Sequence, residues 1–328
     1  MKKNAKFINT EKIEGYVYST GSNFNQLSER VSGENSKNPG TKYIAGDLDI
    51  AVDEAGLNVV TVHYTYVTPT YAKSGQVNNT YTTLKRIIDN PDKTWINGGK
   101  DNALKVQCTG VAININDFIS ADGSKVAAMR NENGFCSIVN ELCAESERNT
   151  FTADMLITKV THVEADENKN IDKDYATVSG AIFGYGSSIP TILPVSFTVR
   201  NEMGINYFEN LDATPSTPIF TKVWGHINCM TIKTERKEES AFGEAAVQTY
   251  ERKSREYVIT GTAKVPYDFG DESVLTVDDI TTMNQNRQIA LAEIEKRFNE
   301  RNLPFSNETK FNSTKIPNMP IPEGGFVF

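Results

Sequence analysis

This 328-residue sequence lacks long apolar runs and closely spaced cysteine pairs. No stretch approaches the roughly 20 consecutive apolar residues of a membrane-spanning helix. The N-terminal residues MKKNAKFINTEK contain no apolar core of a secretory signal. The four cysteines form no CxxC pair, which argues against a zinc ribbon and favours buried free thiols in a reducing compartment. We therefore predict a cytoplasmic protein without a membrane span.

Catalytic and metal-binding motifs are also missing. The sequence has three histidines, each in a strand-like run, and it contains no HExxH, GxSxG or Walker A motif. Asp47 and Asp49 alternate on one predicted strand face, but no further carboxylates follow at a matching spacing. We predict that the protein is not an enzyme and has neither a cofactor nor a metal site.

The charge balance is acidic, with 34 Lys and Arg against 42 Asp and Glu and a formal net charge of −8. This argues mildly against a general polyanion binder, because phosphate contacts need Lys and Arg. A local basic groove can still exist on an acidic protein. The length favours two domains.

The first half is organised around two strand-like runs at residues 42–52 and 57–67, rich in Val, Ile, Tyr and Thr. Gly56 can adopt positive φ, so the pattern predicts a hairpin. Further predicted elements of the first half are a strand over 15–22, a helix over 81–88, and strands over 104–115 and 151–163. Three strands, a short helix and two strands are the order of an OB-fold barrel.

The second half repeats parts of the first. Residues 180–187, GAIFGYGS, resemble residues 15–22, GYVYSTGS, and Gly225 stands in a strand-like run much as Gly110 does. Further strands are predicted over 193–200, 205–211, 219–233, 245–250 and 256–265, with no obvious helix before residue 219. We therefore predict a second barrel of the same kind.

Charge and proline content suggest the remaining boundaries. Residues 164–174, EADENKNIDKD, carry five acidic and two basic side chains, which favours a linker, although a long hairpin loop would fit too. Thr276 can cap a helix that carries Leu291, Ile294 and Phe298 on one stripe. The predicted architecture is mainly β: a first OB-like barrel (1–163), a linker (164–174), a second OB-like barrel (175–270), a C-terminal helix (271–302) and an extended tail (303–328).

Strand aromatics interleaved with basic residues suit single-stranded nucleic acid, because every base has a π-face that can stack. The predicted nucleic-acid-binding residues of the first half are Tyr16, Tyr18, Lys42, Tyr43, Tyr64, Tyr66 and Arg86. Those of the second half are Phe183, Tyr185, Arg200, Lys222, Trp224, Lys233 and Arg236. Because aromatics also line the cores of β-proteins, fewer than half of the aromatics should stack on bases. In particular, Trp224 either lines a groove beside Lys222 or belongs to the core.

Four sequence blocks, IAGDLDIAVDEAGLNVV (44–60), VAININDF (111–118), VWGHI (223–227) and SAFGE (240–244), carry a resemblance. Together with two barrel-like halves, the chain resembles phage-encoded single-stranded DNA-binding proteins with tandem OB-fold domains. The resemblance implies sequence-tolerant binding of single-stranded DNA in phage DNA replication or recombination, in the host cytoplasm. It also implies that Phe326 and Phe328 bind replication or recombination proteins. Two Glu and two Lys make this tail neutral, whereas such proteins have acidic tails.

A second hypothesis comes from another class of protein. A β-rich virion or assembly component, such as a capsid or tail accessory protein, would fit the Asn- and Thr-rich loops and the acidic charge equally well. Mass analysis of purified virions distinguishes the two, because only a structural protein would be present in stoichiometric amounts. The sequence does not indicate an oligomeric state.

Overall fold

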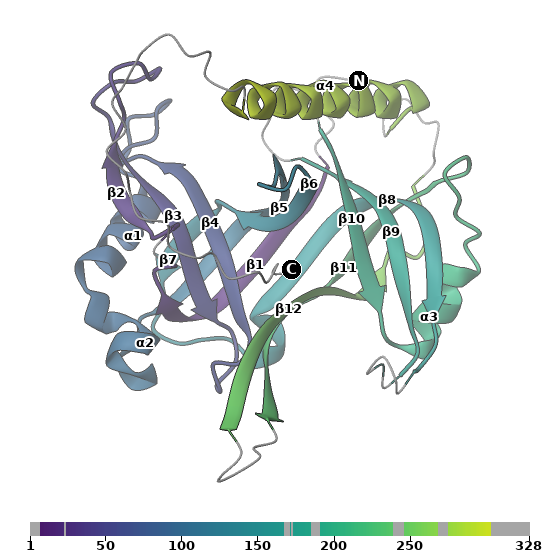
Figure 1. Ribbon diagram of the computed structural model, residues 1–328, viewed down its shortest axis with the longest axis horizontal. Coiled ribbons are helices and arrows are strands. Elements are labelled where there is room, and N and C mark those ends of the chain that lie inside the picture. Colours follow the sequence, from purple (N-terminus) through teal and green to yellow (C-terminus); the bar gives the residue numbers. More distant parts are fainter. Residues whose placement is uncertain are drawn as a thin grey trace.

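The computed structural model describes residues 7–22, 24–166, 171, 173–184, 191–238, 246–267 and 275–302; for residues 231–253 and 301–302 it describes only the backbone. The strands of this part of the chain form one 12-stranded sheet. The sheet coils into two barrels that lie side by side, with a long helix across one end of both (Figure 1).

The first barrel closes through five main strands. They are β1 (Asn9–Ser19), β3 (Lys42–Ala51), β4 (Val59–Val67), β5 (Lys105–Ile119) and β6 (Lys125–Glu132). The pairing order is β1-β3-β4-β6-β5 and back to β1, and only the β4–β6 pair in this circle is parallel. Helix α1 (Asn79–Asp89) lies between β4 and β5, and the Asn78 side chain caps it by accepting a hydrogen bond from Thr80 N at 3.1 Å.

Two short strands and several helical turns flank this barrel. Strand β2 (Ser28–Val31) pairs with β3, and β7 (Phe135–Ile138) pairs with β5. The helical turns η1 (Pro91–Lys93), α2 (Trp95–Gly98) and η2 (Lys100–Asn102) follow α1, and η3 (Glu145–Glu147) precedes the second barrel.

The second barrel has the same connectivity. Its elements are β8 (Asn149–Val163), β9 (Tyr175–Phe183), β10 (Ile192–Val199), α3 (Glu202–Glu209), β11 (Ile219–Glu238) and β12 (Ala246–Thr262). The pairing order is β8-β9-β10-β12-β11 and back to β8, again with one parallel pair, β10–β12. The OB fold is a five-stranded Greek-key barrel, and in both barrels here a helix lies between the third and fourth main strands. The predicted mainly β architecture of two OB-like barrels with a C-terminal helix is confirmed, and the predicted tail, 303–328, lies outside the described residues.

The boundary between the barrels differs from the predicted one. Strand β8 pairs with both β9 and β11 and is the first strand of the second barrel, so the chain crosses between β7 and β8. The described part of 164–174 connects β8 to β9, with Asp166 bridged to Ile171, and is therefore a hairpin loop rather than a linker. An acidic, apolar-poor segment suits either role, so composition could not separate them.

The similar octapeptides that begin at Gly15 and Gly180 do not occupy equivalent strands of the two barrels. Gly15 lies in β1, the first strand of its barrel, whereas Gly180 lies in β9, the second strand. A Cβ on Gly15 would lie 2.1 Å from Ala51 O, and one on Gly180 would lie 2.0 Å from Leu156 O. In both octapeptides the first glycine allows a neighbouring strand to approach closely, but the two octapeptides begin in different strands of their barrels. Gly110 and Gly225, by contrast, both lie in the fourth strand of their barrel, as predicted.

Helix α3 replaces the strand predicted over residues 205–211. The Asn201 side chain caps it by accepting a hydrogen bond from Gly204 N at 2.5 Å. Ile205 and Phe208 are buried against the second barrel. Capping and burial therefore override the strand propensity of this segment.

Helix α4 (Val277–Asn302) begins where the sequence predicts. Asp279 N donates to Thr276 Oγ1 at 3.1 Å, and Thr276 N donates to Asp279 Oδ2 at 3.1 Å, which forms a reciprocal cap. The helix contacts β5 of the first barrel and β10 of the second, so it bridges both rather than packing on one. No helix in the described part of the chain is long and apolar enough to cross a bilayer.

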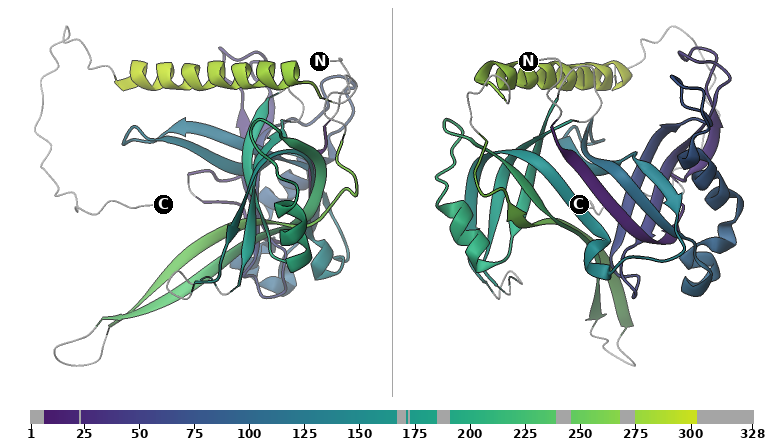
Figure 2. Two further views of the ribbon diagram at one scale, coloured as in Figure 1. Left: turned by 90° about the vertical axis from the view of Figure 1, so that its right-hand side faces the viewer. Right: turned by 180° about the vertical axis from the view of Figure 1, so that it is seen from behind.

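The β11–β12 hairpin extends well beyond its barrel as an arm (Figure 2). Its register continues from Val223 opposite Thr262 to Glu238 opposite Ala246.

Candidate nucleic-acid interface

Two tyrosines from neighbouring strands form a pair on the outside of the first barrel, with Tyr43 half-buried and Tyr66 exposed. Tyr43 of β3 and Tyr66 of β4 have ring centroids 4.5 Å apart with an interplanar angle of 33°. Tyr66 is 44% exposed, whereas Tyr64, two residues before it, is fully buried. The β3–β4 register shifts between Ile44 and Gly46, and this irregularity ends the simple alternation of faces. The Tyr66 hydroxyl lies 3.1 Å from Ser32 Oγ, so the loop before β3 helps to hold the ring.

One basic side chain, Arg30, lies beside the Tyr43–Tyr66 pair, and two more predicted cations lie elsewhere on the first barrel. Arg30 of β2 is exposed and lies directly opposite Tyr43 in the antiparallel register, which puts both side chains on one face. Lys42 pairs with Glu29 at 3.2 Å. Hydrogen bonds from Tyr81 and Lys42 lower the pKa of Glu29. Arg86, also predicted to bind, is exposed in the last turn of α1 and has no ion-pair partner among the described residues.

Two carboxylates on the same face are occupied by the protein itself. Asp47 contacts His63 Nδ1 at 2.6 Å and accepts a hydrogen bond from Asn25 Nδ2 at 3.0 Å. Asp49 accepts hydrogen bonds from Ser19 Oγ at 2.5 Å and Thr61 Oγ1 at 2.6 Å. These contacts fasten the loop after β1 onto the sheet. No group of three or more potential metal-ligating side chains occurs within the described ranges.

Tyr16, Tyr18 and Trp95 form a second group on the first barrel, which we call the β1 aromatic cluster. The Tyr16 and Trp95 centroids are 5.5 Å apart at 89°, and the Tyr18 and Trp95 centroids are 6.1 Å apart. Lys100 Nζ lies 5.5 Å from the Tyr16 centroid and 5.6 Å from the Trp95 centroid. All three rings are half-buried. Tyr16 is opposite Ala51, eight residues along β3 from Tyr43, so the two aromatic groups are separated by about 26 Å along the strand.

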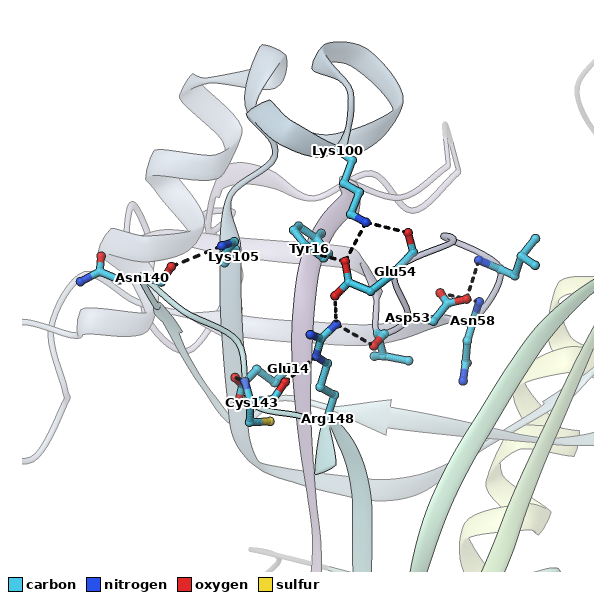
Figure 3. Close-up of polar contacts among 12 residues, drawn as sticks. Glu14, Tyr16, Asp53, Glu54, Asn58, Lys100, Lys105, Asn140, Cys143 and Arg148 are labelled. Atoms are coloured by element: carbon cyan, nitrogen blue, oxygen red, sulfur yellow. Dashed lines mark hydrogen bonds and ion pairs between the residues drawn. The ribbon is translucent and has the colours of Figure 1, made fainter. Parts of the chain in front are cut away.

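Glu54 forms ion pairs with two of the cations beside this cluster (Figure 3). Its carboxylate lies 2.7 Å from both Lys100 Nζ and Arg148 Nη1, and it accepts a hydrogen bond from the Tyr16 hydroxyl at 3.1 Å. Hydrogen bonds from Lys100 and Arg148 lower the pKa of Glu54 to about 2. Lys105, 6.0 Å from the Tyr16 centroid, has no ion-pair partner among the described residues and is the cation available to a ligand.

The predicted residues of the second barrel are more dispersed. Trp224 is 40% exposed, and its ring fills the space where a Cβ on Gly261 would lie, 2.5 Å from Trp224 Nε1. Lys222 is half-buried on the same side of β11. Arg200 lies over the Tyr175 ring, 5.3 Å from its centroid, and donates from Nη2 to Glu256 at 2.7 Å, so its charge is already paired.

Some of the predicted nucleic-acid-binding or partner-binding residues are buried, and others lie wholly or in part outside the described residues. Tyr64 and Phe183 are buried at 0% and 1% exposure and cannot stack on a base, so those two predictions are wrong. Lys233 and Arg236 lie in the β11–β12 arm, opposite Glu251 and Gln248, but their side chains are outside the described part. Tyr185, Phe326 and Phe328 also lie outside the described residues.

The structure adds residues that sequence reasoning missed. Trp95 and Lys100 come from helical turns, where strand periodicity offers no signal. Arg30 lies in a four-residue strand inside a polar segment that carries no strand periodicity. Phe24, fully exposed after β1, is the clearest omission, because a lone Phe in a polar loop was visible in the sequence.

Comparisons with known proteins place the chain in a family. No curated protein shows significant sequence similarity to it. Among solved structures, it is similar to a deletion mutant of the single-stranded DNA binding protein from Thermus aquaticus, with 9% identity, a TM-score of 0.44, and coverage of 81% of this chain and 98% of that one. A sequence model named YorF matches residues 23–297, and the chain therefore belongs to the YorF family.

Proposed function

We propose that this protein binds single-stranded DNA with little sequence preference and acts in phage DNA replication or recombination in the host cytoplasm. One observation carries the proposal: the surface Tyr43–Tyr66 pair on strands β3 and β4 of the first barrel, in which the Tyr66 ring is exposed. These are the second and third strands of an OB fold, and that face, with its adjoining loops, binds oligonucleotides in OB-fold proteins.

The chemistry of this face suits a single strand. Tyrosine rings can stack on any base, and Arg30 beside them can contact a phosphate without reading sequence. Phe24 in the loop after β1 offers a further exposed ring. The nearby carboxylates of Asp47 and Asp49 are hydrogen-bonded within the protein, which reduces their repulsion of phosphate.

The proposal is tested with fluorescent oligo-dT at two salt concentrations. Log affinity should fall with log salt at about −0.7 per neutralised phosphate. Tyr66→Ala should weaken binding by about 1–3 kcal/mol, the value of one stacked base. Tyr66→Phe keeps the ring, loses only the contact with Ser32, and should bind nearly as tightly as the wild type.

Two results would contradict the proposal. One is the absence of oligo-dT binding at low salt, and the other is equal affinity of Tyr66→Ala and wild type. Stoichiometric amounts of the protein in purified virions would instead favour a structural role.

A further inference from the structure

A cleft of about 370 Å³ lies between the two barrels. This volume falls in the range of about 300–1,000 Å³ of small-molecule sites. The lining residues come from the β3–β4 turn, the connection that contains η3, and strands β8, β11 and β12. They are Val52, Asp53, Asn58, Glu145, Ser146, Asn149, His226, Asn228 and Val258.

The two deepest amides of this inter-barrel cleft are held in place by the backbone of the second barrel. Asn58 Oδ1 accepts a hydrogen bond from Cys229 N at 2.8 Å, and Asn149 Nδ2 donates to Ile227 O. Asn58 and Asn149 are 9% and 7% exposed. Each uses one end of its amide for these contacts, and the other end, Nδ2 of Asn58 and Oδ1 of Asn149, has no partner among the described residues. The cleft therefore has a fixed donor and a fixed acceptor.

The approach to the cleft runs along β11. Trp224, His226 and Asn228 alternate with the buried Val223 and Ile227 and so share the outward face of the strand. Trp224 is an exposed ring, and the His226 and Asn228 side chains are half-buried without a hydrogen-bond partner among the described residues. An aromatic platform thus leads into a cleft that offers unused hydrogen-bonding groups.

The charge of the cleft selects the kind of ligand. Asp53 and Glu145 are its charged lining residues, and no Lys or Arg is among them. A lining with two carboxylates and no Lys or Arg does not attract phosphate, whereas a neutral nucleobase has the mixed donor and acceptor edge that three asparagines can match. We propose that the inter-barrel cleft takes one unstacked base of the bound strand, with its hydrogen-bonding edge toward the asparagines and its phosphates outside. This inference rests on the proposed function.

The experiment uses the full chain and oligo-dT that carries one central 2-aminopurine, whose emission rises when it leaves the base stack. Binding to wild-type protein should raise the emission. His226→Ala and Asn228→Ala should lose most of this rise and weaken binding about fivefold or more, the lower limit for losing a good base contact. These variants leave the structural amides Asn58 and Asn149 in place. Asn284→Ala, on the exposed side of α4, is the matched control and should behave as wild type.

Two failures are distinguishable. If both cleft variants match the wild type in emission and affinity, the cleft proposal is overturned while DNA binding stands. If no oligo-dT binds to the wild type, the proposed function itself fails, and the cleft proposal fails with it.

Discussion

The two barrels share their connectivity but place their aromatic side chains differently. In the first barrel, Tyr43 and Tyr66 lie on the outer surface. In the second barrel, Phe151, Phe197 and Tyr257 pack in the interior with ring centroids 5.1–5.4 Å apart. The first barrel therefore presents a paired tyrosine surface on its second and third strands, whereas the second barrel packs three aromatic rings together in its core.

The outer face of the second barrel is also partly covered. Phe183 and Phe220 point outward from β9 and β11, but Phe7, Tyr267 and Met283 of α4 pack over them as a separate apolar cluster. The Phe7 and Phe183 rings stack with centroids 4.1 Å apart. A repeated topology is thus not a repeated binding surface, and we expect the first barrel to contribute most of the stacking.

A buried polar group joins the two barrels. Glu11 of β1 is 2% exposed, and its Oε1 lies 2.9 Å from the hydroxyl of Tyr257 in the second barrel. The same hydroxyl donates to Asn131 Oδ1 of the first barrel at 2.5 Å. Glu11 Oε2 is buried without a hydrogen-bond partner among the described residues. Burial raises the pKa of Glu11 to about 8, so the neutral acid is the favoured form at this junction.

The largest expected effect concerns the core aromatics of the second barrel. Phe197→Ala should reduce the free energy of unfolding by about 3–5 kcal/mol, because it leaves a cavity between Phe151 and Tyr257. Urea unfolding followed by circular dichroism measures this loss. The surface substitution Tyr66→Ala is the matched comparison and should change stability much less. Equal losses of unfolding free energy for the two variants would contradict the assignment of Phe197 to the core and of Tyr66 to the surface.

The next effect concerns the junction. The pKa of Glu11 is above its unfolded value of 4.5 and near 8 in the folded protein, so the native state keeps a proton that the unfolded chain releases between these values. Stability should therefore fall as pH rises from about 4.5 to about 8, by on the order of a few kcal/mol. Glu11→Gln cannot ionise and should flatten this dependence. Unfolding measured at pH 5, 7 and 9 tests it, and an unchanged pH profile in the variant would contradict it.

The smallest effect concerns Trp224, the exposed aromatic of the second barrel. Trp224→Ala should weaken oligo-dT binding by about 1 kcal/mol, the lower end for a stacked base, because part of the ring already covers Gly261. The fluorescence of Trp224, measured in a Trp95→Phe background, should be quenched by oligo-dT. A loss of stability with unchanged affinity would show instead that Trp224 only covers the barrel.

Local patterns in the sequence were sufficient to predict the helices and strands that depend on contacts between residues close together in the chain. The hairpin of β3 and β4, helix α1, and helix α4 with its Thr276 cap all lie where the residues predict them, whereas the Asn78 cap of α1 was not predicted. The order of these elements also predicted an OB-like first half. Strand periodicity, caps and turn glycines act over a few residues, so they can be recognised without knowing the partner of each strand.

Tertiary contacts decided what depends on partners distant in sequence. The residue pattern of 151–163 predicts a strand. Only the pairing of this strand, β8, with β9 and β11 assigns it to the second barrel. Likewise, Tyr64 and Tyr66 look alike in sequence, and the register shift in β3–β4 turns one inward and the other outward. The inter-barrel cleft combines Asn58 with Asn149 and His226, which no local pattern connects. Secondary structure follows from short-range sterics and hydrogen bonding, whereas the face that a side chain presents depends on which strands close each barrel.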